Sequence, residues 1–284
     1  MRLDCDEFMT KERDMKERSA LLSAAEPPAF CYVPGPAETR MLVVCDHASN
    51  RIPESLGMLG INASRLQEHI AYDIGALAVA KGIAQRFGAG LVYGCYSRLV
   101  VDLNRGTRDR SGIPEISDGI LIPGNLALSE VDQAARIATL HAPYHLEIER
   151  ILLAQIEQGS FPVVLAIHSF TPFVSGIPRP WHAGVLWDKD ARFAVPLLDS
   201  IRADQDILVG DNEPYSGRHI ADYTLDRHAE GNGLAHAAIE IRQDLISEPA
   251  TQQHWIKRLG DALDSVLGNQ SLYAHVSGTS VVVG

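Results

Sequence analysis

Residues 41–49 read MLVVCDHAS and residues 162–169 read PVVLAIHS, and these two stretches decide the fold that the sequence predicts. Each is a short apolar run rich in β-branched residues, which favours a buried strand. The first run ends at His47 and the second at His168. Continuously apolar strands are typical of parallel sheets that helices cover on both faces. The two stretches therefore predict an α/β protein.

The segments around these two strands alternate between helical and strand-like patterns. This alternation predicts a mostly parallel mixed sheet with helices on both faces. We expect helices over 71–87, 129–158 (broken or bent near Pro143), 191–203, 222–229 and 251–267. We expect further strands over 90–96, 182–187, 207–209 and 234–242, a strand or a strand end running into a loop over 98–105, and a loop over 106–128.

Composition limits the classes of protein that the chain can belong to. Of its 284 residues, 46% are hydrophobic and 21% charged, as in an ordinary globular protein, and the net charge of -11 argues against a nucleic-acid binder. No apolar run is long enough for a membrane span, no secretory stretch is visible, and the four cysteines form no CxxC pair. We expect a cytoplasmic protein with a polar leader over 1–25, one α/β hydrolase domain over 26–284, and homo-oligomers as an option.

Polar residues gather where the predicted strands end, which is where open α/β sheets bind ligands. Two neutral imidazoles and one carboxylate can hold a zinc ion with one open position. His47 and His168 are the expected imidazole ligands, although each alone could simply bond a loop carbonyl. Asp73, on the apolar face of the predicted helix over 71–87, is the expected carboxylate ligand, with an N-cap role as the alternative. Asp46 and, more weakly, Asn50 remain open as substitutes.

Glu240 is the expected general base, because it lies within the apolar strand AAIEIRQ and burial raises the pKa of a carboxyl group. Its alternative is a salt bridge to Arg242 or Arg98. Arg98 is expected to act in catalysis or to hold a substrate carboxylate, as an arginine fork does. The other expected substrate-binding residues are polar groups at or near strand ends: Asn104, Arg105, Ser169, His228 and Arg242.

The remaining histidines give weaker signals. His141 and His145 have metal-compatible spacing but form HAPYH rather than HExxH, so we expect surface or packing roles. His69 and His275 carry no signal. Arg179 and Tyr215 are minor candidates for the site.

At these residues the sequence resembles the N-formylglutamate amidohydrolase family, in a divergent branch. The matching stretches are VVCDHASNRIPESLG, AYDIGALAVA, SRLVVDLNR, LAIHSFTP and AIEIRQDLI. The resemblance implies a phosphorylase/hydrolase-like three-layer sandwich akin to zinc carboxypeptidases and zinc amidases. It also implies one zinc ion and the ligand order His47, Asp73, His168 with a late Glu240. Asn50 stands where carboxypeptidases have a glutamate, which favours Asp73 as second ligand.

Three functions compete at this point. The leading hypothesis is metal-assisted hydrolysis of the N-formyl or similar N-acyl amide of an acidic amino acid, with a small carboxylate-bearing substrate. The second is a zinc amidase or peptidase for short peptides or cell-wall fragments, which a cavity closed to anything larger than one amino acid would disfavour. The third is a binding protein on a degenerate hydrolase scaffold, which widely separated His47 and His168 would support.

Overall fold

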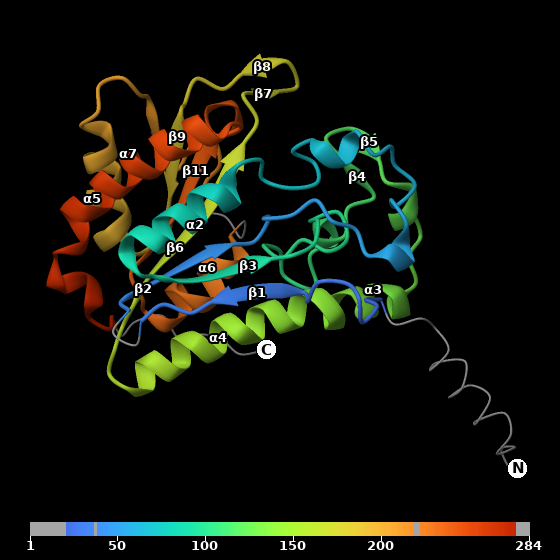
Figure 1. Ribbon diagram of the computed structural model, residues 1–284, viewed down its shortest axis with the longest axis horizontal. Coiled ribbons are helices and arrows are strands. Elements are labelled where there is room, and N and C mark those ends of the chain that lie inside the picture. Colours follow the sequence, from blue (N-terminus) through green and yellow to red (C-terminus); the bar gives the residue numbers. More distant parts are fainter. Residues whose placement is uncertain (1–20, 37–38, 218–221, 277–284) are drawn as a thin grey trace, which may run out of the picture.

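A seven-stranded mixed sheet forms the centre of the computed structural model, which describes residues 21–36, 39–217 and 222–276 (Figure 1). The strand order is β1-β3-β2-β6-β11-β9-β10. Strands β3, β2, β6 and β11 run parallel, whereas β1 is antiparallel to β3 and the parallel pair β9 and β10 is antiparallel to β11. The predicted fold class is confirmed. The strands are β1 (Phe30–Val33), β2 (Met41–Cys45), β3 (Gly90–Gly94), β6 (Val163–Phe170), β9 (Ala183–Leu186), β10 (Val209–Asp211) and β11 (His236–Arg242).

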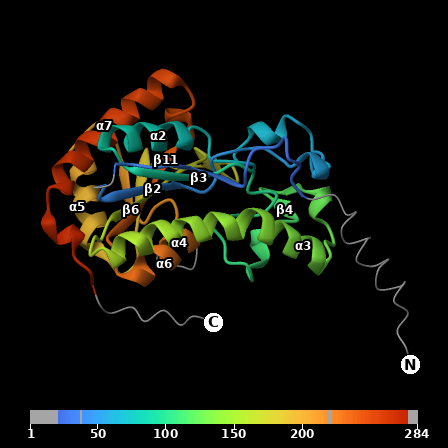
Figure 2. The same ribbon diagram turned by 60° about the horizontal axis from the view of Figure 1, so that its bottom comes forward.

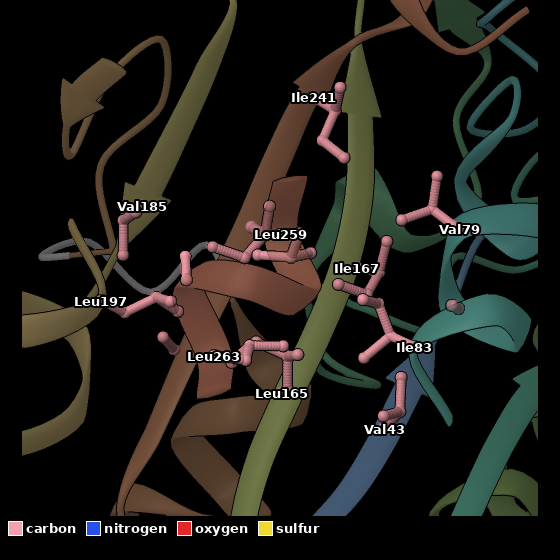
Figure 3. Close-up of a cluster of buried hydrophobic side chains, with 14 of the residues drawn as sticks. Val43, Val79, Ile83, Leu165, Ile167, Val185, Leu197, Ile241, Leu259 and Leu263 are labelled. Carbon is pink, nitrogen blue, oxygen red and sulfur yellow. The ribbon is translucent and has the colours of Figure 1, made fainter. Parts of the chain in front are cut away.

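Helices cover both faces of this sheet and make three layers (Figure 2). One face carries α2 (Ala76–Phe87), α5 (Ala191–Arg202) and α7 (Pro249–Leu267). The other carries α4 (Ala142–Glu157) and α6 (Tyr223–His228). On the first face, alternate strand residues pack against the apolar stripes of the helices, as the labelled side chains in Figure 3 show. Residues of the opposite parity pack against α4 and α6.

The predicted helical stretch over 129–158 is interrupted just before Pro143. It consists of α3 (Glu130–Arg136), a π-helical segment (Ile137–His141) and α4. Pro143 lies in the first turn of α4, where its missing N–H costs nothing in α4 itself but removes a donor to the preceding turn. The π-helical segment absorbs that irregularity, since such bulges typically occur where the regular hydrogen-bond ladder is interrupted.

Two short hairpins lie beyond the carboxyl ends of the parallel strands (Figure 1). The first is β4 (Ile116–Ser117) with β5 (Ile120–Leu121), and the second is β7 (Phe173–Val174) with β8 (Ile177–Pro178). The remaining elements are single 3-10 turns, at Glu54–Leu56, Arg65–Gln67, Arg110–Gly112, Pro123–Asn125, Glu230–Asn232, Gln243–Leu245 and Gln270–Tyr273.

Residues 98–105, expected to be a strand or a strand end running into a loop, contain no strand, because this segment is a buried series of turns. Ser97 stabilises the turns locally: its Oγ accepts a hydrogen bond from the Leu99 N–H at 3.1 Å, and its carbonyl accepts one from Val100 at 3.0 Å. Such side-chain bonds compete with a strand ladder for the same backbone groups. The apolar residues of the segment are instead buried in a third cluster beside the sheet.

Two elements begin later than predicted, and part of the predicted leader lies outside the described residues. The helix predicted from residue 71 begins at Ala76, since Gly75 has a φ of 80° and forms its N-cap. The strand predicted over 207–209 is β10, which starts at Val209. Residues 1–20 of the predicted leader lie outside the described residues. Within the part of the chain that is described, no helix combines the length and apolarity that a bilayer crossing requires.

Gly184 lets a neighbouring segment cross closely over β9. A Cβ atom at this position would overlap with the carbonyl oxygen of Glu213. Gly184 is also the register partner of Glu240 on β11. The absence of a side chain at Gly184 therefore brings the segment that follows β10 over the sheet near the end of β11.

Candidate metal centre

Three buried residues meet at the carboxyl ends of the parallel strands. His168 lies near the end of β6, and His47 follows the end of β2 by two residues. Asp73 comes from the turn before α2, and its backbone N–H donates a 2.9 Å hydrogen bond to the carbonyl of His47. One ligand atom from each residue lies within 4.8 Å of the others, which makes the trio a candidate metal cluster.

The imidazoles both direct Nδ1 at the same carboxylate oxygen. Asp73 Oδ2 lies 2.9 Å from His168 Nδ1 and 3.4 Å from His47 Nδ1. Donor atoms that share a tetrahedral ion at bond lengths of about 2.0–2.1 Å are separated by about 3.3 Å. The spacing of the three atoms therefore fits a single small divalent ion. His47 Nδ1 is buried and has no hydrogen-bond partner, which is consistent with a ligand atom.

A second carboxylate lies beside the far nitrogen of each imidazole. His47 Nε2 lies 2.7 Å from Asp102 Oδ1, and His168 Nε2 lies 3.3 Å from Asp46 Oδ2. Histidines that bind metals usually present their other nitrogen to a carboxylate, which fixes the tautomer and the ring orientation. Asp46, left open as a ligand, thus lies behind His168, and Thr224 Oγ1 donates to its other oxygen at 2.7 Å.

The second oxygen of Asp73 faces two cationic or polar side chains. Arg98 Nη2 donates a hydrogen bond to Asp73 Oδ1, and His69 Nδ1 lies 3.7 Å from the same oxygen. Arg98 therefore pairs with the expected carboxylate ligand. The alternative N-cap role of Asp73 does not apply, because the N-cap of α2 is Gly75. His69 carried no signal by itself, but its spacing of four residues from Asp73 would have been a reason to consider it.

Glu240 lies beside the cluster on the neighbouring strand. It is the direct register partner of His168 in the parallel pair β6 and β11, so both side chains point to the same face. Glu240 is 7% exposed, and its Oε2 has no hydrogen-bond partner. Among the described residues no cation lies within ion-pair distance of Glu240. The alternative role of Glu240, a salt bridge to Arg98 or Arg242, is therefore wrong. Burial raises the pKa of its carboxyl group.

The pKa values of His47 and His168 are shifted in opposite directions. Burial, together with the charge of Arg98, lowers the pKa of His47. Burial also opposes protonation of His168, but the contact with Asp46 and the charge of Glu240 outweigh it and raise its pKa to about 9. The carboxyl groups of Asp46 and Asp102 resist ionisation through burial, yet their histidine partners lower both pKa values. The surrounding carboxylates thus favour the protonated form of His168, whereas burial and Arg98 favour the neutral form of His47.

A cavity of about 180 Å³ opens directly on these residues. Of the expected substrate-binding residues, Asn104, Arg105 and Ser169 line it, together with Arg98 and Glu240. Asn104 Oδ1 accepts a 3.0 Å hydrogen bond from the Thr224 N–H, which ties the loop to α6. The other lining residues are His47, His69, Asp73, His168, Leu186, Tyr215, Ser216, Gly217 and Asp222.

Two expected substrate-binding residues lie outside this cavity. Arg242 Nε donates to Asp244 at 2.8 Å, because the end of β11 turns there into a 3-10 turn. His228 is buried on α6, and its Nε2 lies 2.9 Å from His145 Nδ1. We therefore assign no substrate role to either residue.

The other residues considered from the sequence also have structural partners. His141 and His145 are buried rather than on the surface; their Nε2 atoms lie 2.9 Å from the Arg105 carbonyl and 2.8 Å from the Leu103 carbonyl, which agrees with the packing role. Asn50, the weaker substitute ligand, donates instead to the Leu66 carbonyl at 2.8 Å.

Two histidines, a carboxylate and a buried glutamate at the ends of parallel strands form an arrangement that metal-dependent hydrolases use. The family model for N-formylglutamate amidohydrolase matches residues 39–247, which is most of the chain. The chain belongs to this family and is therefore an amidohydrolase by class.

Solved structures share the fold of this chain. The crystal structure of gene product Atu2144 from Agrobacterium tumefaciens is 37% identical, with a TM-score of 0.82 over 87% of this chain and 99% of that one. The crystal structure of N-formylglutamate amidohydrolase from Ralstonia eutropha JMP134 shares the fold at 19% identity, with a TM-score of 0.57 over 85% of this chain and 99% of that one. No curated protein matches the chain.

Proposed function

We propose that this protein hydrolyses the N-acyl amide of an acidic amino acid, with N-formylglutamate as the first substrate to test. The observation that carries the proposal is the convergence of His47 Nδ1 and His168 Nδ1 on Asp73 Oδ2, next to the unpartnered Glu240 Oε2. Family membership supports the amide as the bond that is cleaved.

The donor set fits a zinc ion held by His47, Asp73 and His168, since two imidazoles and a carboxylate leave a fourth position open. A bound zinc ion would polarise the amide carbonyl as a Lewis acid and lower the pKa of water in the site. Asp102 holds the His47 ring in position through Nε2, and Asp46 lies 3.3 Å from Nε2 of His168. Arg98 holds the carboxylate of Asp73 through its second oxygen.

Glu240 is suited to move the proton that this hydrolysis requires. Its Oε2 would take a proton from the attacking water and return it to the nitrogen of the leaving amine, so that water and amide become carboxylic acid and amine. The raised pKa supports this role, because a carboxyl group must gain and lose a proton near neutral pH. Its place opposite His168 puts it beside the ligands rather than among them.

A peptide or cell-wall amidase is the second candidate. The site cavity shares His69, Arg98 and Tyr215 with a neighbouring cavity of about 330 Å³, and this adjacent space favours a substrate longer than one amino acid. The binding-protein alternative required His47 and His168 to lie far apart, whereas their ring centroids are 5.3 Å apart.

The test is a zinc-loaded hydrolysis assay over N-formyl, N-acetyl and N-succinyl amino acids that reads the released amine. We expect N-formyl-L-glutamate to be cleaved and Glu240→Gln to lower kcat by more than about 100-fold, the scale of a general base, with unchanged zinc content. The control is Glu157→Gln, which changes an exposed glutamate on α4. Full activity of Glu240→Gln would refute the role of Glu240, and cleavage of peptides alone would favour the second candidate.

A further inference from the structure

The larger cavity beside the metal centre lies between the two hairpins. Its volume is about 330 Å³, and its walls include Ser117 and Asp118 at the β4–β5 turn and residues 173–175 of the β7–β8 hairpin. It also shares His69, Arg98 and Tyr215 with the cavity at the metal centre. The two cavities are therefore adjacent, and a substrate whose amide lies at the metal ligands would extend its remaining part past these shared residues toward the hairpins.

Two arginines line this larger cavity, and they differ in their partners. Arg98 is paired with Asp73. Arg179, just after β8, has no acidic group within ion-pair distance among the described residues, and Asp118 is the one acid in the cavity lining. A guanidinium is always charged and favours a carboxylate partner. Arg179 is thus the cation in the cavity whose charge the protein itself leaves uncompensated.

The side chain of Arg179 is held in one orientation. Its Nη1 donates to Tyr215 Oη at 2.9 Å and to Thr171 Oγ1 at 3.3 Å. The guanidinium also lies over the Tyr215 ring, 4.8 Å from the centroid. Both described hydrogen-bond partners use Nη1, so the edge formed by Nε and Nη2 remains for a bidentate contact with a carboxylate.

From this geometry we infer that Arg179 binds a carboxylate of the substrate's amino-acid part and sets the preference for anionic substrates. The inference rests on the proposed function for the identity of the reaction. The carboxylate is either the α-carboxylate or the side-chain carboxylate of the amino acid, and both would be bound by the same fork. Tyr215 acts as a positioning residue, because it touches the guanidinium and lines both cavities.

The kinetic test compares the zinc-loaded protein with Arg179→Gln on three substrates. The first is N-formyl-L-glutamate. The second is N-formyl-L-glutamine, which lacks the side-chain carboxylate, and the third is N-formyl-L-glutamic acid α-amide, which lacks the α-carboxylate. We expect the KM for N-formyl-L-glutamate to rise about 10- to 100-fold with kcat nearly unchanged, the effect of losing a hydrogen-bonded charge pair. The analogue whose KM does not respond to the mutation identifies the bound carboxylate. An equal change for all three, or none, would overturn the inference.

Binding of glutarate, measured by calorimetry on the same zinc-loaded proteins, separates this inference from the proposed function. We expect glutarate to bind the starting protein and to lose about 10-fold or more affinity in Arg179→Gln, with partial recovery in Arg179→Lys. Tyr215→Phe should weaken binding less, since it removes only the positioning hydroxyl. If no formyl amide is cleaved, the proposed function fails, while the glutarate result still decides the role of Arg179.

Two controls exclude indirect effects. Arg258→Gln changes another partly buried arginine, which lies on α7, pairs with Asp204 and lines neither cavity. This substitution should leave glutarate affinity unchanged. Asp118→Asn should leave it unchanged or strengthen it, because it removes the competing acid from the cavity. Weaker glutarate binding in Asp118→Asn would contradict the inference, and so would equal affinity in Arg179→Gln and the starting protein.

Discussion

The candidate site has a half that strands position and a half that loops position. His168 and Glu240 lie on adjacent central strands, and the register of β6 and β11 fixes them opposite each other. Asp73, Arg98 and Asp102 come from turns, and individual hydrogen bonds fix them instead. One such bond runs from the Asp73 N–H to the His47 carbonyl. The strand-positioned half is thus held by the whole sheet, and the loop-positioned half by a small number of contacts.

The loop-positioned half depends on Ser97 in particular. Its buried Oγ donates to the Ala71 carbonyl at 2.7 Å, and the Arg98 N–H donates to the same carbonyl at 3.2 Å. The Ser97 N–H donates to the Arg51 carbonyl at 2.8 Å. Three separate loops are therefore joined near one residue. Substitutions in the two halves should therefore have different effects. Those on the strands should remove metal binding or catalysis, and those in the loops should lower stability or disturb the orientation of the imidazole rings.

The largest expected effect is the loss of zinc binding in His168→Ala. This substitution removes a ligand from the rigid half, and the affinity should fall by more than about 100-fold, beyond the loss that removal of an outer partner causes. Isothermal titration with zinc measures it. His254→Ala, which changes an exposed histidine on α7, is the matched control. Zinc affinity equal to that of the control would mean that the two-histidine cluster does not bind the ion.

An intermediate effect is expected for Asp102→Asn. The substitution keeps the shape of the side chain but weakens its hold on His47 Nε2, which lies 2.7 Å away. Zinc affinity or kcat/KM should fall by about 10- to 100-fold, as for other partners of metal-bound histidines. A titration with zinc and a kinetic assay on the same sample measure both. If neither quantity changes, the loop does not orient His47.

Ser97→Ala should have the smallest effect on zinc binding and catalysis. Its main effect should be on the stability of the fold. Because it leaves the buried Leu99 N–H without its partner and removes one of the two hydrogen bonds to the Ala71 carbonyl, it should lower the free energy of unfolding by about 1–3 kcal/mol. Urea unfolding followed by circular dichroism measures this. Ser247→Ala, at an exposed serine, controls for the substitution itself. Equal stability of the two variants would show that Ser97 does not join the loops.

The same division explains what could be predicted from the sequence. His168 and Glu240 follow from apolar strand patterns, because parallel strands align their ends at one edge of the sheet. The segment 98–105 is apolar enough to be predicted as a strand, yet Ser97 turns it into loops. Its distant partners, such as the Ala71 carbonyl, are not visible in local sequence.

Asp73 and His69 illustrate the limits at the level of single residues. Asp73 was predicted for its place on a helix face, but it lies before the helix and is fixed by the backbone of His47. His69 had no periodic pattern to single it out. Arg242 and His228 were predicted from their nearness to strand ends or site segments, although Arg242 pairs with Asp244 and His228 lies behind the site on α6.

Gly184 has a consequence for how substrate preference could change in this family. It lies beneath the segment that carries Tyr215, and that segment crosses so closely that no side chain fits. Any larger residue there would displace the chain that leads to the hydroxyl group holding Arg179. The choice of substrate could thus drift through a position on β9 that lines neither cavity. A laboratory search for altered selectivity would gain from including such hidden positions in its libraries.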